Sequence, residues 1–290
     1  MIDETAETEG TILVPIANTE TAERQLDIAI DLAIDQSYEI MLLYVLSVPS
    51  QLSLQDGRQY LLEDENEQLL ADAAERVECH GVPVDTRIRI ARGIATGIVG
   101  AVDAYEADTV LLGWRGRPPR GDVVLGSHLD TVLRNATCDV LVKRIKTPTD
   151  DVNSVLVPVA GGPHDSFSAE TAAAIARRHD ASVTLLYVLE SDDPEMSRPE
   201  AEALLGETAR TFDGAQSISR ELVKSDNVAG TITDRTATHE ITVLGVSRGG
   251  IVQRRLLGTI SEAVGRHAAG TVILAKRYDP VPSRLKRLLS

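Results

Sequence analysis

The chain contains the same sequence pattern twice. The segment Val14–Ala17 (VPIA) returns as Val157–Ala160 (VPVA), and Leu42–Leu46 (LLYVL) returns unchanged as Leu185–Leu189, both 143 residues later. Two segments that repeat in the same order at one offset predict two copies of one structural unit. The length of 290 residues leaves roughly 140 residues for each copy, which is enough for a domain with its own core.

The second copy is shorter than the first. Leu111–Gly113 (LLG) corresponds to Val243–Gly245 (VLG), and this offset is only 132 residues. The second copy lacks residues somewhere within 190–215, the segment that corresponds to residues 47–80 of the first copy. We therefore expect the two domains to share their strands and to differ in one connection.

Apolar runs alternate with amphipathic stretches along the first copy. Aromatic residues make up 3% of the chain, so the cores must be built from Val, Ile, Leu and Ala. Strict alternation of such strands with helices predicts an α/β fold, with a doubly wound, five-stranded parallel sheet in each copy and helices on both faces. Ligands of such Rossmann-like sheets bind at the carboxyl ends of the strands. The expected strands are 11–16, 40–46, 84–91, 109–113 and 139–142, and the expected helices are 20–35, 59–78, 96–105 and 127–135.

Charge and cysteine content exclude several classes of protein. Forty-four acidic and 29 basic residues give a net charge of −15, which disfavours nucleic-acid binding because phosphate contacts need clustered Lys and Arg. The abundance of Asp and the use of Arg in place of Lys are typical of a salt-adapted protein, although a merely acidic mesophilic protein remains an alternative. Cys79 and Cys138 lack paired spacing, and the six histidines are scattered, so neither a disulfide framework nor a metal site is expected. The acidic start and the absence of a long apolar run predict a cytoplasmic protein.

A glycine-rich loop follows the fourth expected strand. Its pattern is Gly113, two residues, Gly116, nine residues, and then Gly126 with Ser127 at the start of the next helix. Glycines let backbone N–H groups approach an anion, and a helix N-terminus favours phosphate. The alternative interpretation is an ordinary glycine turn followed by a Ser-capped helix. Three arginines in the loop offer partners for phosphate oxygens, namely Arg115, Arg117 and Arg120.

The glycine pattern, on a repeat that opens with residues 12–15 (ILVP) and closes with residues 138–142 (CDVLV), resembles the universal stress protein family. The resemblance covers residues 10–146 and 152–278, as a tandem member. It implies two adenine nucleotide hydrolase-like domains that pair in the manner of a dimer. It also implies binding of ATP or another adenine nucleotide, and a role in stress response or regulation more than in catalysis.

The resemblance assigns a nucleotide site to the first copy and assigns no catalytic residue. Members that bind ATP have an Asp where this chain has Ala17 and a small hydroxyl residue where it has Leu129. In this chain, the neighbouring Asn18 is the candidate substitute for that Asp. Trp114 is expected to pack locally, with stacking on a base as the alternative. The residues assigned to the phosphates and ribose are Leu112, Gly113, Arg115, Gly116, Gly126, Ser127 and His128, and those that flank the base are Ile16 and Val45.

The loop of the second copy departs from the pattern. Arg248 stands in place of the second glycine, before Gly258 and Thr259, and Ala160 again replaces the Asp. A Cβ at Arg248 disfavours the same turn and crowds an anion. We therefore expect the second copy to be a structural partner of the first or to bind a different ligand.

Three functions follow, in decreasing order of preference. The first is a nucleotide-binding regulatory protein. The second is a module that binds no nucleotide and regulates a partner such as a membrane amino-acid transporter. The third is a slow ATPase. The sequence leaves open whether two chains pair with each other. The expected organisation is a disordered acidic start (1–9), a first domain (10–146), a linker (147–153), a second domain (154–278) and a basic tail (279–290).

Overall fold

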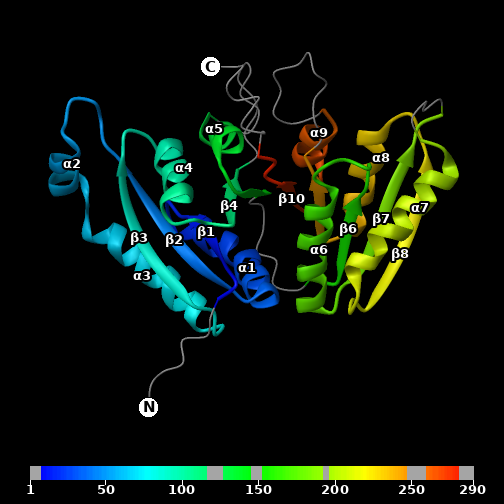
Figure 1. The fold of residues 1–290 in the computed structure, drawn as a ribbon, viewed down its shortest axis with the longest axis horizontal. Coiled ribbons are helices and arrows are strands. Elements are labelled where there is room, and N and C mark those ends of the chain that lie inside the picture. Colours follow the sequence, from blue (N-terminus) through cyan, green and yellow to red (C-terminus); the bar gives the residue numbers. More distant parts are fainter. Residues whose placement is uncertain (1–7, 116–126, 145–151, 192–195, 247–258, 281–290) are drawn as a thin grey trace.

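The computed structural model describes residues 8–115, 127–144, 152–191, 196–246 and 259–280 (Figure 1). Strands and helices alternate through both halves, as the sequence predicts. The first half contains β1 (Gly10–Pro15), α1 (Thr19–Gln36), β2 (Tyr38–Ser47), α2 (Leu54–Leu61), α3 (Asp64–Glu78), β3 (Val84–Ala91), α4 (Ile94–Ala104), β4 (Thr109–Trp114), α5 (Ser127–Asn135) and β5 (Asp139–Arg144).

The second half repeats this order with shorter connections. It contains β6 (Ser154–Pro158), α6 (Asp165–His179), β7 (Ser182–Leu189), α7 (Arg198–Thr208), a 3-10 turn (Ala209–Phe212), β8 (Ser217–Lys224), α8 (Val228–Arg235), a second 3-10 turn (Thr236–Thr238), β9 (Ile241–Gly245), α9 (Thr259–His267) and β10 (Thr271–Lys276).

All ten strands form one sheet in the order β3-β2-β1-β4-β5-β10-β9-β6-β7-β8. The strands run parallel within each half, and the halves meet where β10 pairs antiparallel with β5, with Ile273 opposite Lys143. The predicted doubly wound, five-stranded parallel sheet is therefore present twice. The two sheets join edge to edge at their fifth strands, which is how the two domains pair.

Helices cover both faces of the sheet and enclose two apolar layers. One layer lies under α1, α3, α6 and α7 and includes Leu26, Leu70 and Leu205. The other lies under α4, α5, α8 and α9 and includes Val132 and Val264. Because successive strand residues point to opposite faces, β1 contributes Ile12 and Val14 to the first layer and Leu13 to the second. Within the described residues, no helix is long and apolar enough to cross a membrane.

The prediction of a single helix over residues 59–78 is wrong. The structure has two helices, because Leu62 is extended (φ −81°, ψ 121°) and Glu63 is the N-cap of α3. Glu63 N–H donates to Asn66 Oδ1 at 3.1 Å, which completes a capping box and starts a new helix. In the described part of the second half α2 has no counterpart, which matches the shortening expected near residues 190–215.

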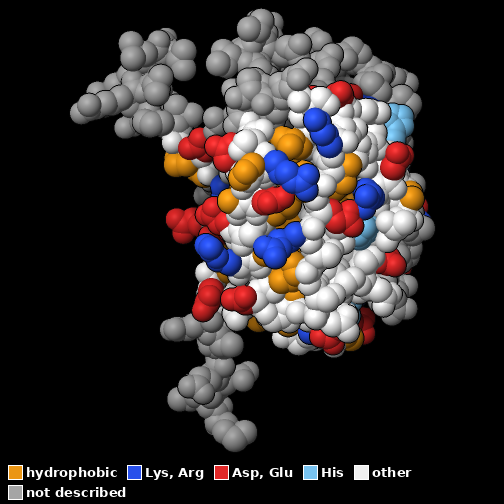
Figure 2. Space-filling model, turned by 90° about the vertical axis from the view of Figure 1, so that its right-hand side faces the viewer, with side chains coloured by type: hydrophobic (Ala, Val, Ile, Leu, Met, Phe, Trp, Pro, Cys, Tyr) orange, Lys and Arg blue, Asp and Glu red, His pale blue; other side chains and the backbone are white. Residues whose placement is uncertain are grey.

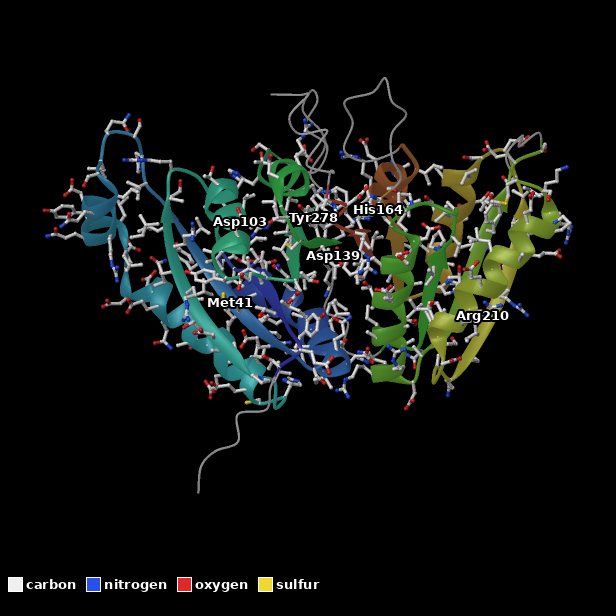
Figure 3. The ribbon with its side chains drawn as sticks, in the orientation of Figure 1. Met41, Asp103, Asp139, His164, Arg210 and Tyr278 are labelled. Atoms are coloured by element: carbon white, nitrogen blue, oxygen red, sulfur yellow. The ribbon has the colours of Figure 1, made fainter. Side chains whose placement is uncertain are left out.

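The junction of the two halves is polar at one end of the joined strands. The Asp139 carboxylate accepts from Tyr278 N–H at 2.7 Å and from Arg277 Nη1 at 3.0 Å. Arg277 N–H also donates to His164 Nδ1 at 3.2 Å. Figure 3 shows Asp139, Tyr278 and His164 between the two halves. These contacts fix the end of β10 against the start of β5.

Trp114 also joins the halves, so the expectation of local packing is wrong. It is the last residue of β4 and is 2% exposed. The Arg266 guanidinium of α9 lies 5.9 Å from the Trp114 ring centroid. A Cβ on Gly265 would come within 3.0 Å of Trp114 Cζ3, so the glycine allows the indole to reach the second half.

The outer edge of the second half carries charged, polar and apolar side chains together. Four residues at the start of β8 are exposed, including Ile218 and Arg220. Figure 2 views the molecule from this side and shows Lys and Arg side chains mixed with Asp, Glu and apolar groups. Charges on an edge strand discourage pairing with further strands.

Candidate functional site

The first half contains a cleft of about 440 Å³ at the carboxyl ends of β1, β2 and β4. The chain leaves β1 toward β2 on one side of the sheet and returns to β4 on the other side, so the loops diverge at this point. Such a switch in strand order is where parallel α/β sheets bind ligands. The lining residues are Pro15, Ile16, Ala17, Asn18, Thr21, Gln25, Leu43, Tyr44, Val45, Ile94, Ile98, Leu112, Gly113, Arg115, His128 and Leu129.

The walls of the cleft are mostly apolar. Ile16, Val45 and Leu112 are buried strand-end residues, and Ile16 N–H donates to Leu43 O at 2.9 Å, which continues the pairing of β1 with β2. Ile94 and Ile98 are four residues apart in α4 and therefore share one helix face. We call this apolar part of the cleft, lined by Ile16, Val45, Ile94, Ile98 and Leu112, the slot.

The rim of the cleft is basic. Arg115 follows β4 and His128 is the second residue of α5; both side chains are exposed and both line the cleft. No Asp or Glu is among its described lining residues. The N-terminus of α5 adds partial positive charge at the same place. The combination favours an anionic group above an apolar slot.

Of the sequence-assigned residues, the structure brings six together and separates one. Ile16, Val45, Leu112, Gly113, Arg115 and His128 line the cleft. Ser127 begins α5 as expected, but it lies outside the lining, and its carbonyl accepts from Thr131 Oγ1 at 2.7 Å. Gly116 and Gly126 fall outside the described residues, as do Arg117 and Arg120.

Asn18 lines the cleft beside Ala17, but its oxygen is already used. Asn18 Oδ1 accepts from Thr21 N–H and from Thr21 Oγ1, each at 3.0 Å, and so caps α1. An Asp at position 17 would have offered a free acceptor to a ligand. Asn18 offers its amide N–H₂ instead, so it does not reproduce the chemistry of the missing carboxylate.

Sequence reasoning missed Gln25. This residue is 2% exposed and lines the cleft. Its Nε2 donates to Leu111 O at 2.6 Å, and its amide oxygen has no hydrogen-bond partner among the described residues. A polar residue between the apolar positions Ala22 and Ala29 of α1 was the available signal, because these positions face the sheet.

The described residues contain no group of three or more His, Cys, Asp or Glu side chains placed to hold a metal ion. Ser127 and His128 are both exposed on the first turn of α5.

In the second half, Arg248 and Gly258 lie outside the described residues. Gly245 ends β9 there, as Gly113 lies near the end of β4.

Comparison with known proteins identifies relatives over both halves. The model of the universal stress protein family matches residues 10–144 and 152–276. A universal stress protein of Mycobacterium tuberculosis is 25% identical over 269 residues, which cover 92% of this chain and 96% of that protein. The crystal structure of a universal stress protein from Archaeoglobus fulgidus covers 94% of this chain and 98% of its own, with a TM-score of 0.66 and 18% identity. This likeness shows the fold alone.

A further relative is a transport protein. The Na+/H+ antiporter NhaS5 of Synechocystis is 24% identical over 270 residues, or 91% of this chain. The chain spans only 38% of the length of that antiporter.

Proposed function

The chain belongs to the universal stress protein family, and from this premise we propose that it is a regulatory protein whose first half binds an adenine nucleotide such as ATP. The observation that carries the proposal is the cleft at the ends of β1, β2 and β4, where a basic rim overlies an apolar slot. A nucleotide has the same division into a flat apolar base and an anionic end. The cleft and a nucleotide thus match in the arrangement of their apolar and charged parts.

In this proposal the base lies in the slot between Ile16, Val45 and Ile98. The phosphates lie at the rim, where Arg115 donates charge-assisted hydrogen bonds and His128 adds a further donor. The backbone of Gly113 and the start of α5 complete the anion site. Six of the nine residues that the family resemblance assigns line this cleft; Ser127 lies outside the lining, and Gly116 and Gly126 fall outside the described residues.

Gln25 replaces the acceptor that Ala17 lacks. In this proposal its amide oxygen accepts a hydrogen bond from the ligand, and the hydrogen bond from Nε2 to Leu111 O holds the side chain in place. A buried acceptor of this kind selects a ligand that carries an N–H or O–H donor, because an unsatisfied partner would cost about 1–3 kcal/mol. An adenine amino group or a ribose hydroxyl supplies such a donor.

Isothermal titration with ATP, ADP, AMP and cyclic AMP tests the proposal. Arg115→Gln should weaken nucleotide binding by about tenfold or more, since a hydrogen bond to a charged group contributes about 1.5–3 kcal/mol. The matched control is Arg58→Gln, which makes the same charge change at an exposed residue of α2 outside the cleft. Equal losses in the two variants, or no heat from the unmodified protein with any nucleotide, would rule the site out.

The likeness to a Na+/H+ antiporter over 91% of this chain favours a second candidate function. In it the chain is a module that regulates a membrane transporter without binding nucleotide. The sequence-based expectation was an amino-acid transporter, whereas the relative found is an ion antiporter. This function would be supported if the tagged chain co-purified with a cation antiporter from solubilised membranes and if titration with nucleotides gave no heat of binding. Nucleotide binding without a membrane partner would count against it.

A further inference from the structure

The second half has its own cleft, of about 230 Å³, at the carboxyl ends of β6, β7 and β9. It occupies the position that the repeat makes equivalent to the first cleft, since Ala160 corresponds to Ala17 and Val188 to Val45. The lining residues are Pro158, Val159, Ala160, Asp165, Leu186, Tyr187, Val188, Glu190, Val228, Ile232, Leu244, Gly245, Ile260 and Ser261.

The two clefts share an apolar body but differ in charge. Val188, Ile232 and Leu244 wall the second cleft much as Val45, Ile98 and Leu112 wall the first. The first cleft has Arg115 and His128 at its rim. The second has Asp165 and Glu190, and no Lys, Arg or His is among the described residues that line it.

Asp165 fills an anion site that the backbone of this half provides. Its Oδ2 accepts from Ala160 N–H at 2.7 Å, Gly161 N–H at 2.7 Å and Gly162 N–H at 3.1 Å. Gly161 has φ +74°, a conformation that glycine adopts readily and that helps consecutive N–H groups converge. An external phosphate therefore finds these three donors already occupied by a carboxylate of the protein.

The second oxygen of Asp165 is directed toward the end of β9. Oδ1 lies 3.0 Å from the place that a Cβ on Gly245 would take. The absence of a side chain at Gly245 thus lets the carboxylate approach this strand end, which lines the cleft. Glu190, which follows β7, is exposed and adds a second negative charge to the lining.

We propose that the second cleft binds a small organic cation, a primary amine or amidine with an apolar body. The charged end pairs with Asp165 Oδ1 and Glu190, and the apolar body lies against Val188, Ile232 and Leu244. A half-buried carboxylate and an exposed one beside an apolar wall attract such a cation and repel a phosphate compound. This inference does not depend on nucleotide binding in the first half.

The test uses phenethylamine as the probe and 3-phenylpropionate as the anionic counterpart with a similar apolar body. Both are titrated into the full-length, isotope-labelled protein while backbone NMR signals are followed. We expect phenethylamine to shift the signals of Val188, Ile232 and Gly245 and to leave those of Val45 and Gly113 in place. We expect 3-phenylpropionate to leave the second cleft unshifted.

Charge removal completes the test. Asp165→Asn with Glu190→Gln should weaken phenethylamine binding by about tenfold or more. Glu190→Gln alone leaves the three contacts of Asp165 intact and should give a smaller loss. Asp213→Asn, an exposed acid of the same half outside the cleft, should change nothing. Unchanged binding in the double variant, no shift with the amine, or equal binding of the anion would overturn the proposal.

Discussion

Lys143 carries an ammonium group into the apolar layer beneath α1. Its side chain is fully buried, and Nζ donates to Asp27 Oδ1 and Oδ2 at 2.6 Å and to Arg24 O at 2.5 Å. Burial lowers the pKa of Lys143, and the neighbouring Asp27 carboxylate opposes that shift. The pair is tolerated because the ammonium has an opposite charge and a carbonyl beside it.

Asp27→Ala should destabilise the protein by about 3 kcal/mol or more, because it leaves a buried ammonium without its carboxylate. Urea denaturation followed by circular dichroism measures this change in the free energy of unfolding. Asp27→Leu combined with Lys143→Met should recover much of the loss, since it removes both charges. A loss below about 1 kcal/mol, the range of an exposed ion pair, would show that Asp27 does not hold Lys143.

The two cysteines should differ in reactivity. Burial, with the Asp139 carboxylate nearby, raises the pKa of the Cys138 thiol to about 12. A raised pKa means that the thiol keeps its proton throughout the neutral range, so that at pH 8 only about one molecule in ten thousand carries the reactive thiolate. Cys79 is exposed.

Iodoacetamide at pH 8 should therefore modify one cysteine of the native protein, and peptide mass spectrometry should locate the label at Cys79. Cys138 should react only after unfolding in urea. Modification of Cys138 at a rate similar to Cys79 under native conditions would contradict its burial beside Asp139.

The sequence predicts which strand-end residues line the cleft better than it predicts which helix residues do. Ile16, Leu112 and Gly113 lie at ends of apolar strands, and parallel strands bring these ends to one edge whatever the remaining fold. The motif assigns Ser127 to the site, whereas in the structure Ser127 is not among the residues that line the cleft. Gln25 contributes through a contact with Leu111, which is 86 residues away, and no local pattern predicts such a contact.

Among the elements, α1 and α6 pair acids with bases across the junction and lie close together near the middle of the molecule (Figure 1). Arg177 of α6 donates from Nε and Nη2 to Asp35 of α1, each at 2.7 Å. His179 Nε2 lies 2.9 Å from Asp31 Oδ2. In the repeat, Asp31 corresponds to Ala174 and Asp35 to Arg178, so two identical halves could not form the same pairs. These contacts favour pairing of unlike halves.

Reversing one charge tests this pairing. Arg177→Asp should lower stability by about 1 kcal/mol, because a bidentate ion pair is replaced by two facing carboxylates. The added change Asp35→Arg should restore most of the loss, and Asp35→Arg alone should cost about as much as Arg177→Asp. Thermal unfolding of the four proteins measures the coupling. Additive losses in the double variant would show that the two side chains do not interact.

The division between α2 and α3 shows where element boundaries escape sequence patterns. Neither Pro nor Gly lies between Leu61 and Asp64, and apolar periodicity continues through both helices. The break depends on Asn66, whose side chain accepts the Glu63 N–H and thereby competes with continuation of the helix. A capping box with Glu as the N-cap is a weak signal, because Ser, Thr, Asp and Asn are the usual residues there.

The whole molecule is a pair of similar halves with dissimilar clefts. The repeat predicts both five-stranded sheets, but the antiparallel contact of β5 with β10 joins residues 130 or more apart. The family resemblance implies dimer-like pairing of the domains, but it does not say which strands join. The glycines at 161 and 162 predict a turn before a helix, but they do not predict that the Asp165 carboxylate accepts from three backbone N–H groups of that turn and lines the second cleft.

Under the proposed function, the asymmetry of the halves gives one nucleotide site per chain. Equilibrium dialysis of the full-length protein against radiolabelled ATP measures this number directly, with Arg115→Gln in the first cleft and Asp165→Asn in the second as paired variants. We expect one ATP per chain at saturation, weaker binding with Arg115→Gln and an unchanged site count with Asp165→Asn. Two bound ATP molecules per chain, or none, would contradict a single nucleotide site in the first half.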